Sequence, residues 1–144
     1  VALIDHGAVR FAFIGYNEFD GGWSASTTIR QIQDARALDR VPVVFAHWGD
    51  EYVAATVRQK DLAHRFIDAG AEIVIGAHPH VIQESEVYEG KRIYYSLGNF
   101  IFDQYWNDDV STGLTVKVRF NRAGVVSADE ARVKLQRDRR TCAL

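Results

Sequence analysis

The chain has 144 residues, with 17 lysines and arginines against 19 aspartates and glutamates, which gives a formal net charge of -2. Its 47% hydrophobic and 25% charged residues are typical of a globular domain and exclude a disordered or fibrous chain. The near-neutral charge gives no electrostatic basis for binding nucleic acid, so nucleic acid is not an expected partner. The single cysteine, Cys142, excludes an internal disulfide.

The first half of the chain alternates strand and helix patterns. Two β-rich runs, at residues 1–4 and 9–16, flank a predicted tight turn. A glycine-rich loop at residues 20–22 then leads to residues 24–38, where apolar side chains recur on one helical face. This part of the sequence predicts a hairpin followed by a helix.

The next segment continues the alternation. The apolar run at residues 41–46 is typical of a strand buried on both faces. Thr56 and Gln59 form a capping-box signature for a helix that ends at Gly70, and residues 72–76 predict another buried strand. The order strand, helix, strand, helix, strand favours an α/β fold with mixed sheets flanked by helices.

The last third of the chain predicts strands alone. Residues 82–88 and 91–97 flank a Glu-Gly hairpin signal. Residues 112–120 alternate apolar and polar side chains, and a turn at residues 121–124 leads into a further strand. The charged residues 137–144 are expected to be a frayed polar tail.

Three of the five histidines directly follow predicted buried strands. His47 follows the strand at residues 41–46, and His78 and His80 follow the strand at residues 72–76. Because open α/β sheets bind ligands outside the carboxyl ends of their strands, the three rings are expected to meet at one sheet edge. Convergent imidazoles are typical of a metal site. The alternative is that the His-x-His segment is an ordinary surface turn.

The backbone around these histidines carries its own expectation. Pro79 disfavours the helical region for His78, and residues two apart in an extended chain point to the same side. The segment is therefore expected to be extended and to aim His78 and His80 at one volume. His6, in the first turn, and His64, within a predicted helix, are not expected to be ligands.

Two further polar residues are candidates for the same site. Glu51 follows His47 closely and is a candidate partner that orients its ring, although Asp50 and Glu51 are also interpretable as solvated loop acids. Asn99 and Asp103 lie in the aromatic-rich run at residues 94–103, whose aromatic side chains are assigned to the core. The roles of these two residues stay open on the sequence pattern alone.

Three ordered motifs carry a family resemblance: residues 47–52 (HWGDEY), 76–81 (GAHPHV) and 95–103 (YSLGNFIFD). Together they resemble the C-terminal half of the CapA family of poly-γ-glutamate capsule biosynthesis proteins, over roughly residues 9–120. That family is similar to the calcineurin-like metallophosphoesterases. The resemblance therefore implies the C-terminal half of a two-sheet α/β sandwich with helices outside.

The resemblance also implies a set of roles. His47, His78 and His80 correspond to metal ligands for divalent ions (Mn, Zn or Fe), Glu51 would orient His47, and Asn99 would touch substrate. The superfamily's early ligands, in acidic and Asn-His motifs, have no match in these residues. Residues 1–136 are therefore interpreted as the C-terminal portion of a CapA-like metallophosphatase domain that holds half of a two-metal site.

The function that the resemblance implies is metal-dependent hydrolysis of a phosphate ester, with capsule polymer or a small phosphorylated molecule as substrate. The intact protein is expected outside the cytoplasm and at the membrane. A non-catalytic envelope protein that keeps the fold to bind polymer or partners is the alternative. Since three neutral imidazoles do not balance a cation's charge, the segment alone is expected to be weakly active or inactive.

An incomplete sandwich leaves part of a sheet uncovered. The missing N-terminal half of the domain is therefore an expected partner. Exposed apolar sheet area also favours a dimer or a strand-swapped oligomer.

Overall fold

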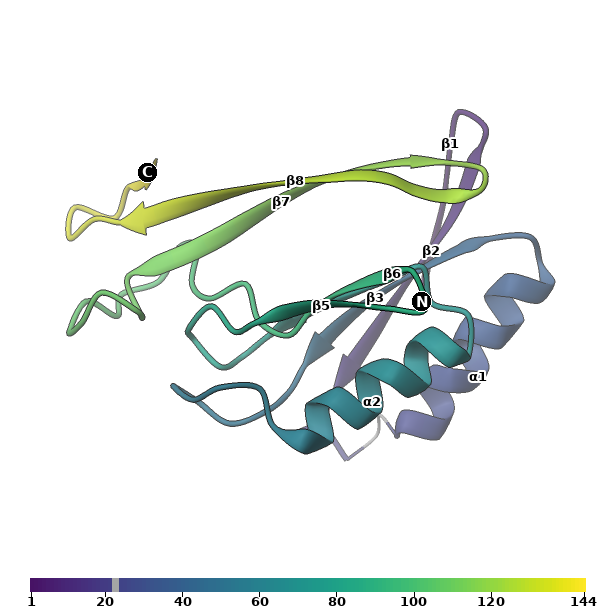
Figure 1. Ribbon diagram of the computed structural model, residues 1–144, viewed down its shortest axis with the longest axis horizontal. Helices are drawn as coiled ribbons and strands as arrows, with labels where there is room; N and C mark the ends of the chain where they lie inside the picture. The colour runs from purple at the N-terminus through teal and green to yellow at the C-terminus, as the bar shows by residue number, and fades with distance from the viewer. Residues whose placement is uncertain (22–23) are drawn as a thin grey trace.

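Two helices, a six-stranded sheet and a three-stranded sheet form three layers in the computed structural model, which describes residues 1–21 and 24–144 (Figure 1). The helices cover one face of the larger sheet, and the smaller sheet lies over its other face. The predicted α/β fold with mixed sheets is confirmed. Residue 22 of the predicted glycine-rich loop lies outside the described residues. Among the residues described, no helix has the length and apolar character needed to cross a membrane.

The larger sheet has the strand order β1-β2-β3-β4-β6-β5. Strands β2, β3, β4 and β6 run parallel, while β1 and β5 pair antiparallel at the two edges. The bounds of the strands are β1 (Ala2–His6), β2 (Val9–Asn17), β3 (Val41–His47), β4 (Ile73–Ala77), β5 (Ser85–Tyr88) and β6 (Lys91–Tyr94). The carboxyl ends of β3 and β4 therefore lie side by side.

Helices α1 (Ala25–Ala37) and α2 (Val57–Asp68) begin at caps that the sequence encodes. The predicted capping box of α2 is confirmed, because Thr56 Oγ1 accepts from the Gln59 amide at 3.2 Å and Gln59 Oε1 accepts from the Thr56 amide at 2.9 Å. Leu62, Ala63 and Phe66 of α2 are buried against the sheet. The apolar face of α2 thus packs against the sheet at β4, with α1 beside it over β2 and β3.

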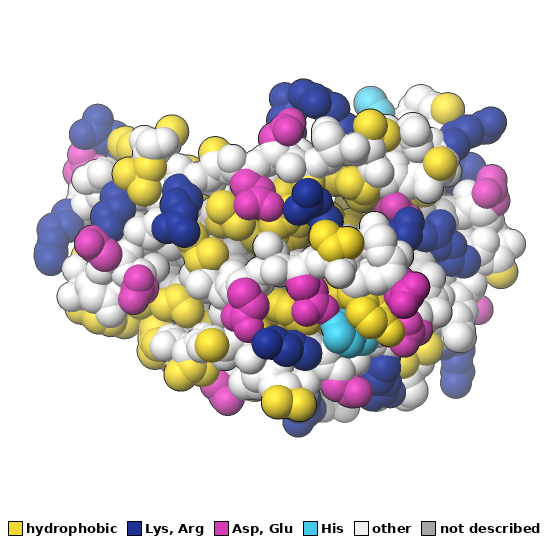
Figure 2. Space-filling model, in the orientation of Figure 1, with side chains coloured by type: hydrophobic (Ala, Val, Ile, Leu, Met, Phe, Trp, Pro, Cys, Tyr) yellow, Lys and Arg dark blue, Asp and Glu magenta, His cyan; other side chains and the backbone are white. Residues whose placement is uncertain are grey.

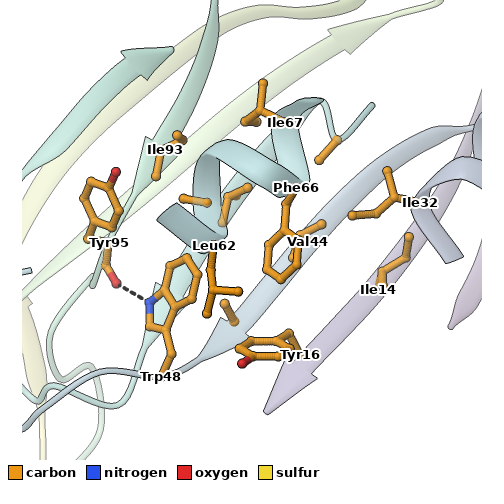
Figure 3. Close-up of a cluster of buried hydrophobic side chains, with 14 of the residues drawn as sticks. Ile14, Tyr16, Ile32, Val44, Trp48, Leu62, Phe66, Ile67, Ile93 and Tyr95 are labelled. Atoms are coloured by element: carbon orange, nitrogen blue, oxygen red, sulfur yellow. Dashed lines mark hydrogen bonds between the residues drawn. The ribbon is translucent and has the colours of Figure 1, made fainter. Parts of the chain in front are cut away.

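The core between helices and sheet is rich in aromatic side chains (Figure 3). Trp48 and Phe66 stack with ring centroids 6.4 Å apart, and Tyr16 meets both rings edge-on. The buried Trp48 donates from Nε1 to the Tyr95 carbonyl oxygen at 2.9 Å, which Figure 3 shows as a dashed line. The indole is therefore buried with its polar atom satisfied, directly after His47 in the chain.

The smaller sheet has the order β7-β8-β9. Its strands are β7 (Thr112–Asn121), β8 (Gly124–Leu135) and β9 (Thr141–Ala143). The prediction of a frayed tail is wrong for Thr141–Ala143, which pairs with β8. The polar composition of the tail did not reveal this pairing, because an edge strand needs backbone hydrogen bonds rather than a buried side-chain face.

The surface mixes charge of both signs. On the face that Figure 2 shows, lysines and arginines alternate with aspartates and glutamates. Hydrophobic side chains are visible on this face between the smaller sheet and the layer beneath it. The apolar space between the two sheets is thus only partly closed.

Glu72 connects the two sheets and the helical layer. Its side chain is 2% exposed, and Oε2 accepts from Arg36 Nη2 at 3.0 Å and from Lys91 Nζ at 2.6 Å. Oε1 accepts from the Val125 amide of β8 at 2.8 Å. A Cβ at Gly124 would lie 2.0 Å from this oxygen, so the close approach of β8 needs glycine there.

The pKa of Glu72 follows from these contacts. Burial alone raises the pKa of this carboxyl, but hydrogen bonds from Lys91, the Val125 amide and Arg36 outweigh it. The net pKa lies below the ordinary value of a glutamate. The ionised form therefore stabilises the folded state.

Replacing Glu72 by glutamine tests this link. Glu72→Gln keeps the size of the side chain but removes the charge that Lys91 and Arg36 neutralise, so the free energy of unfolding at neutral pH is expected to fall by about 1–3 kcal/mol. Urea denaturation measures the change. Asp129→Asn is the control: its ion pair with Arg119 spans 3.6 Å between exposed side chains, so a loss below about 0.5 kcal/mol is expected.

The effect of pH gives a second measurement. Since the folded-state pKa of Glu72 lies below an unfolded value of about 4.3, its contribution is complete above about pH 4.3 and disappears as the pH falls through the folded-state pKa. The difference in stability between the wild-type chain and Glu72→Gln should therefore stay constant from neutral pH to about pH 5 and shrink below about pH 4. A difference that grows on acidification would contradict the assignment.

Candidate metal centre

Three histidine rings lie side by side at the carboxyl ends of β3 and β4. His47 is the last residue of β3 and pairs in register with Ala77, the last residue of β4. His78 follows, and its ring centroid is 4.8 Å from that of His47 and 5.8 Å from that of His80. The expected meeting of the three rings at one sheet edge is therefore observed.

The backbone of the His-x-His segment differs from the extended conformation expected from the sequence. His78 has φ 103° and His80 has φ 60°, so both residues lie in the left-handed half of conformational space. The prediction that Pro79 makes this segment extended is wrong. Hydrogen bonds from the adjoining loop hold the turn instead: the Trp48 amide donates to the Ala77 carbonyl at 3.1 Å and the Tyr52 amide donates to the Pro79 carbonyl at 2.9 Å.

Glu51 joins the cluster on a side that sequence reasoning did not expect. Its carboxylate and the rings of His78 and His80 each offer a ligand atom, all within 4.8 Å of one another. Glu51 Oε1 is 3.8 Å from His80 Nε2. The sequence prediction gave Glu51 the role of orienting His47, whereas the structure groups it with the other two histidines.

Asn99 lies on the Nδ1 side of the His80 ring, opposite the Nε2 atom that faces Glu51. Its side chain is 6% exposed. Asn99 Oδ1 is 2.9 Å from His80 Nδ1, and Nδ2 donates to the Val110 carbonyl oxygen at 2.8 Å and to Gln104 Oε1 at 3.1 Å. These contacts are with protein groups, and the expected contact of Asn99 with substrate stays a prediction.

The pKa of the His47 ring lies below its ordinary value. Burial lowers the pKa of the His47 ring, and the neighbouring rings of His78 and His80 lower it further. A neutral imidazole has a free nitrogen lone pair and is the form that binds a metal ion. The pKa of His47 therefore suits a ligand or a neighbour of a bound cation.

Exposed aromatic side chains flank the histidines. Phe19 lies 4.4 Å from His78 between ring centroids, and Phe102 lies 4.9 Å from His80. Tyr52 stacks on His80 at 5.9 Å and meets Trp106 edge-on at 5.7 Å. Phe19 and Trp106 were not predicted as neighbours of the site.

The aromatic-rich run at residues 94–103 has some aromatic side chains in the core and others on the surface. Tyr94 and Tyr95 are buried, as expected, but Phe102 is 44% exposed, so its assignment to the core is wrong. The chain leaves the sheet after β6, so Phe102 lies in a loop and not on a strand that faces the core. A sequence signal was present, since Asn99 and Asp103 are polar residues that interrupt this aromatic run.

The remaining histidines lie outside the cluster. His64 of α2 contacts Glu86 through Nε2 and stacks on Tyr88, with ring centroids 3.9 Å apart. His6 ends β1 at the first hairpin. Neither belongs to the metal-type cluster found among the described residues.

Comparison with known proteins gives one family and several partial matches. Residues 4–104 match the family described as bacterial capsule synthesis protein PGA_cap. The PGA biosynthesis protein CapA of Bacillus subtilis (strain 168) is 49% identical over 79 residues, which cover 54% of this chain and 21% of that protein. The capsule biosynthesis protein CapA of Bacillus anthracis is 54% identical over 65 residues, which cover 44% of this chain and 16% of that protein.

A more distant relative has a related name. A probable polyglutamine synthesis accessory protein of Mycobacterium tuberculosis (strain CDC 1551 / Oshkosh) is 38% identical over 73 residues, or 50% of this chain and 19% of that protein. The matched segments thus span about a fifth of the length of these relatives or less.

Gly76 of β4 provides a test of how the site is supported. A Cβ there would lie 2.0 Å from the Tyr95 carbonyl oxygen and 2.5 Å from Trp48 Nε1. Gly76→Ala is expected to break the Trp48–Tyr95 hydrogen bond and to lower the free energy of unfolding by about 1–3 kcal/mol, measured by urea denaturation. The control is Gly15→Ala in β2, where a Cβ would meet nothing within 4 Å, so a change within about 0.5 kcal/mol is expected. Equal losses at the two positions would show that the contact at Gly76 is unimportant.

Proposed function

The chain belongs to the bacterial capsule synthesis protein family PGA_cap, and we propose that its histidine cluster binds a divalent metal ion and serves phosphoesterase-type hydrolysis in capsule, poly-γ-glutamate, synthesis. The observation that carries the metal part is the grouping of Glu51, His78 and His80 within 4.8 Å, with His47 beside them. The names of the relatives support the capsule part.

The chemistry of the donor set fits a divalent cation. Two imidazoles and one carboxylate form a set that catalytic zinc sites use. Ligands of one ion, each bound at about 2.0–2.2 Å, lie no more than roughly 4.4 Å apart, so a small inward movement of these side chains would complete the set. Nitrogen and oxygen donors suit Mn, Fe and Zn, and the metal's identity is unknown.

Glu51 changes the charge balance expected from the sequence. Three neutral imidazoles add no negative charge, whereas the Glu51 carboxylate supplies one beside His78 and His80. A cation in this group is therefore partly neutralised by the chain itself. This carboxylate makes metal binding by the chain more favourable than histidines alone would.

Each side chain of the cluster has a role in this proposal. A bound cation supplies Lewis-acid polarisation of a phosphoryl oxygen and lowers the pKa of a coordinated water. His78 and His80 would hold such an ion through ring nitrogens and Glu51 through its carboxylate. His47 would be available as a further ligand, and Phe19 and Phe102 lie against the rings of His78 and His80.

A second candidate is a binding role without turnover in the same capsule context. The observation in its favour is the row of exposed aromatic side chains beside the cluster, among which Phe19 is 57% and Trp106 is 61% exposed. Exposed apolar side chains that lie together are typical of interaction sites. In this case the metal cluster would help to hold a polymer or a partner.

Metal binding is the first experiment. The metal-free chain is titrated with Zn²⁺ and with Mn²⁺ by calorimetry, and one ion per chain is expected to bind. Glu51→Gln, His78→Ala and His80→Ala should each weaken binding by more than about tenfold, because each removes a donor. His64→Ala is the matched control and should bind as the wild-type chain does. If the wild-type chain binds neither ion, the metal part of the proposal is wrong.

Turnover is measured on the full-length protein, since the matched segments cover only part of the relatives. Chromogenic phosphodiester and phosphomonoester substrates are expected to be hydrolysed in the presence of the metal, and His80→Ala should abolish the reaction while His64→Ala retains it. Metal binding without turnover would instead support the binding role. Turnover that survives His80→Ala would refute the assignment of the site.

A further inference from the structure

We propose that Asn99 is a positioning residue that fixes the hydrogen of the neutral His80 ring on Nδ1 and leaves Nε2 free toward Glu51 and His78. The inference rests on the proposed metal function. It adds that the tautomer of one ligand, His80, is already set in the metal-free chain. The buried Asn99 side chain makes three hydrogen bonds that support this role.

The orientation of the Asn99 amide follows from its three contacts. Nδ2 donates to the Val110 carbonyl oxygen at 2.8 Å and to Gln104 Oε1 at 3.1 Å, so both amide hydrogens are used. The reverse orientation would place Oδ1 against the Val110 carbonyl, which is also an acceptor. Oδ1 is therefore the atom that faces His80.

The neighbouring amide agrees with this orientation. Gln104 Nε2 donates to the Tyr52 hydroxyl at 3.0 Å, which leaves Gln104 Oε1 as the acceptor that Asn99 needs. Two amides in series thus have one consistent set of donors and acceptors. The chain of bonds runs from Val110 to Tyr52, beside Glu51.

The hydrogen on His80 follows from the atom that faces it. Asn99 Oδ1 has no hydrogen to donate, and it lies 2.9 Å from His80 Nδ1. Nδ1 must therefore donate, and in a neutral ring Nε2 then carries the lone pair. Nε2 is the nitrogen that lies 3.8 Å from Glu51 Oε1, within the metal-type cluster. The opposite arrangement would aim an N–H group at the cluster and could not bind a cation.

Two glycines fix the position of Asn99. Gly98 has φ 70° and forms an isolated bridge with Gly113 of β7. A Cβ at Gly113 would lie 1.9 Å from the Asn99 carbonyl oxygen, so the Asn99 backbone packs directly on β7. This segment is separate from the loops that carry the three candidate ligands, so it can position His80 without binding the ion.

The test reads the ring directly by ¹H–¹⁵N NMR of the histidines in the metal-free chain, at about pH 8.5, well above an ordinary histidine pKa of about 6.5. In the wild-type chain, His80 Nδ1 should show the shift of a protonated nitrogen and Nε2 that of an unprotonated one. In Asn99→Leu the two forms should mix, with protonated Nε2 now present. His64, which pairs with Glu86 elsewhere, should keep its spectrum and reports an intact fold.

Zinc affinity gives the second readout. Asn99→Leu is expected to weaken Zn²⁺ binding by about 10–100-fold, and Asn99→Asp, which keeps an acceptor for His80 Nδ1, should recover part of that loss. A hydrogen on Nε2 in the wild-type spectrum, or an unchanged ring in Asn99→Leu, would overturn the inference. If Asn99→Leu does not fold, the wild-type spectrum still decides. Failure of the wild-type chain to bind zinc would instead overturn the metal function. The NMR result would still decide whether Asn99 sets the tautomer of His80.

Discussion

The parallel pairing of β3 with β4 determines where the site lies. His47 pairs with Ala77 across these strands, so the residue after Ala77 is placed beside the His47 ring. Beside this pairing, Gly76 leaves room for the Trp48 indole and for the Tyr95 backbone to pack against β4. A shift of one residue in this register would turn His47 to the opposite face of the sheet and separate it from His78. The sheet therefore sets the separation of two of the three histidines.

The sheet does not place Glu51, which lies in the loop between β3 and α2. A buried pair of amides holds that loop: Gln59 Nε2 donates to Gln83 Oε1 at 2.9 Å, and Gln83 Nε2 donates to the Val53 carbonyl oxygen at 2.9 Å. Gly49, with φ 82°, passes so close to Gln59 that a Cβ would lie 2.4 Å from its side chain. Gln59 thus caps α2 and also supports the loop that carries the carboxylate.

The strand pairing could be predicted from the sequence, whereas the loop contacts that place Glu51 could not. The order of elements and the meeting of His47 with His78 were predictable, because apolar runs mark buried strands and parallel strands end at one edge. The partner of Glu51 was not predictable, because the path of its loop depends on Gln83, which lies 24 residues from Gln59 along the chain. The strand in the tail was missed for a related reason, since its pairing uses backbone groups that no side-chain pattern reports.

The left-handed backbone at His78 and His80 joins these observations. Non-glycine residues in such conformations cost on the order of 1–3 kcal/mol each and persist only where the surroundings enforce them. Three hydrogen bonds hold this conformation. The Trp48 and Tyr52 amides donate to carbonyl groups of the turn, and the Asn99 side chain contacts the His80 ring. An ordinary surface turn has no need of such restraint, because it can relax to a common conformation. The strain at these two histidines therefore favours a turn shaped to present its rings, and the free energy that holds it comes from the buried network behind them.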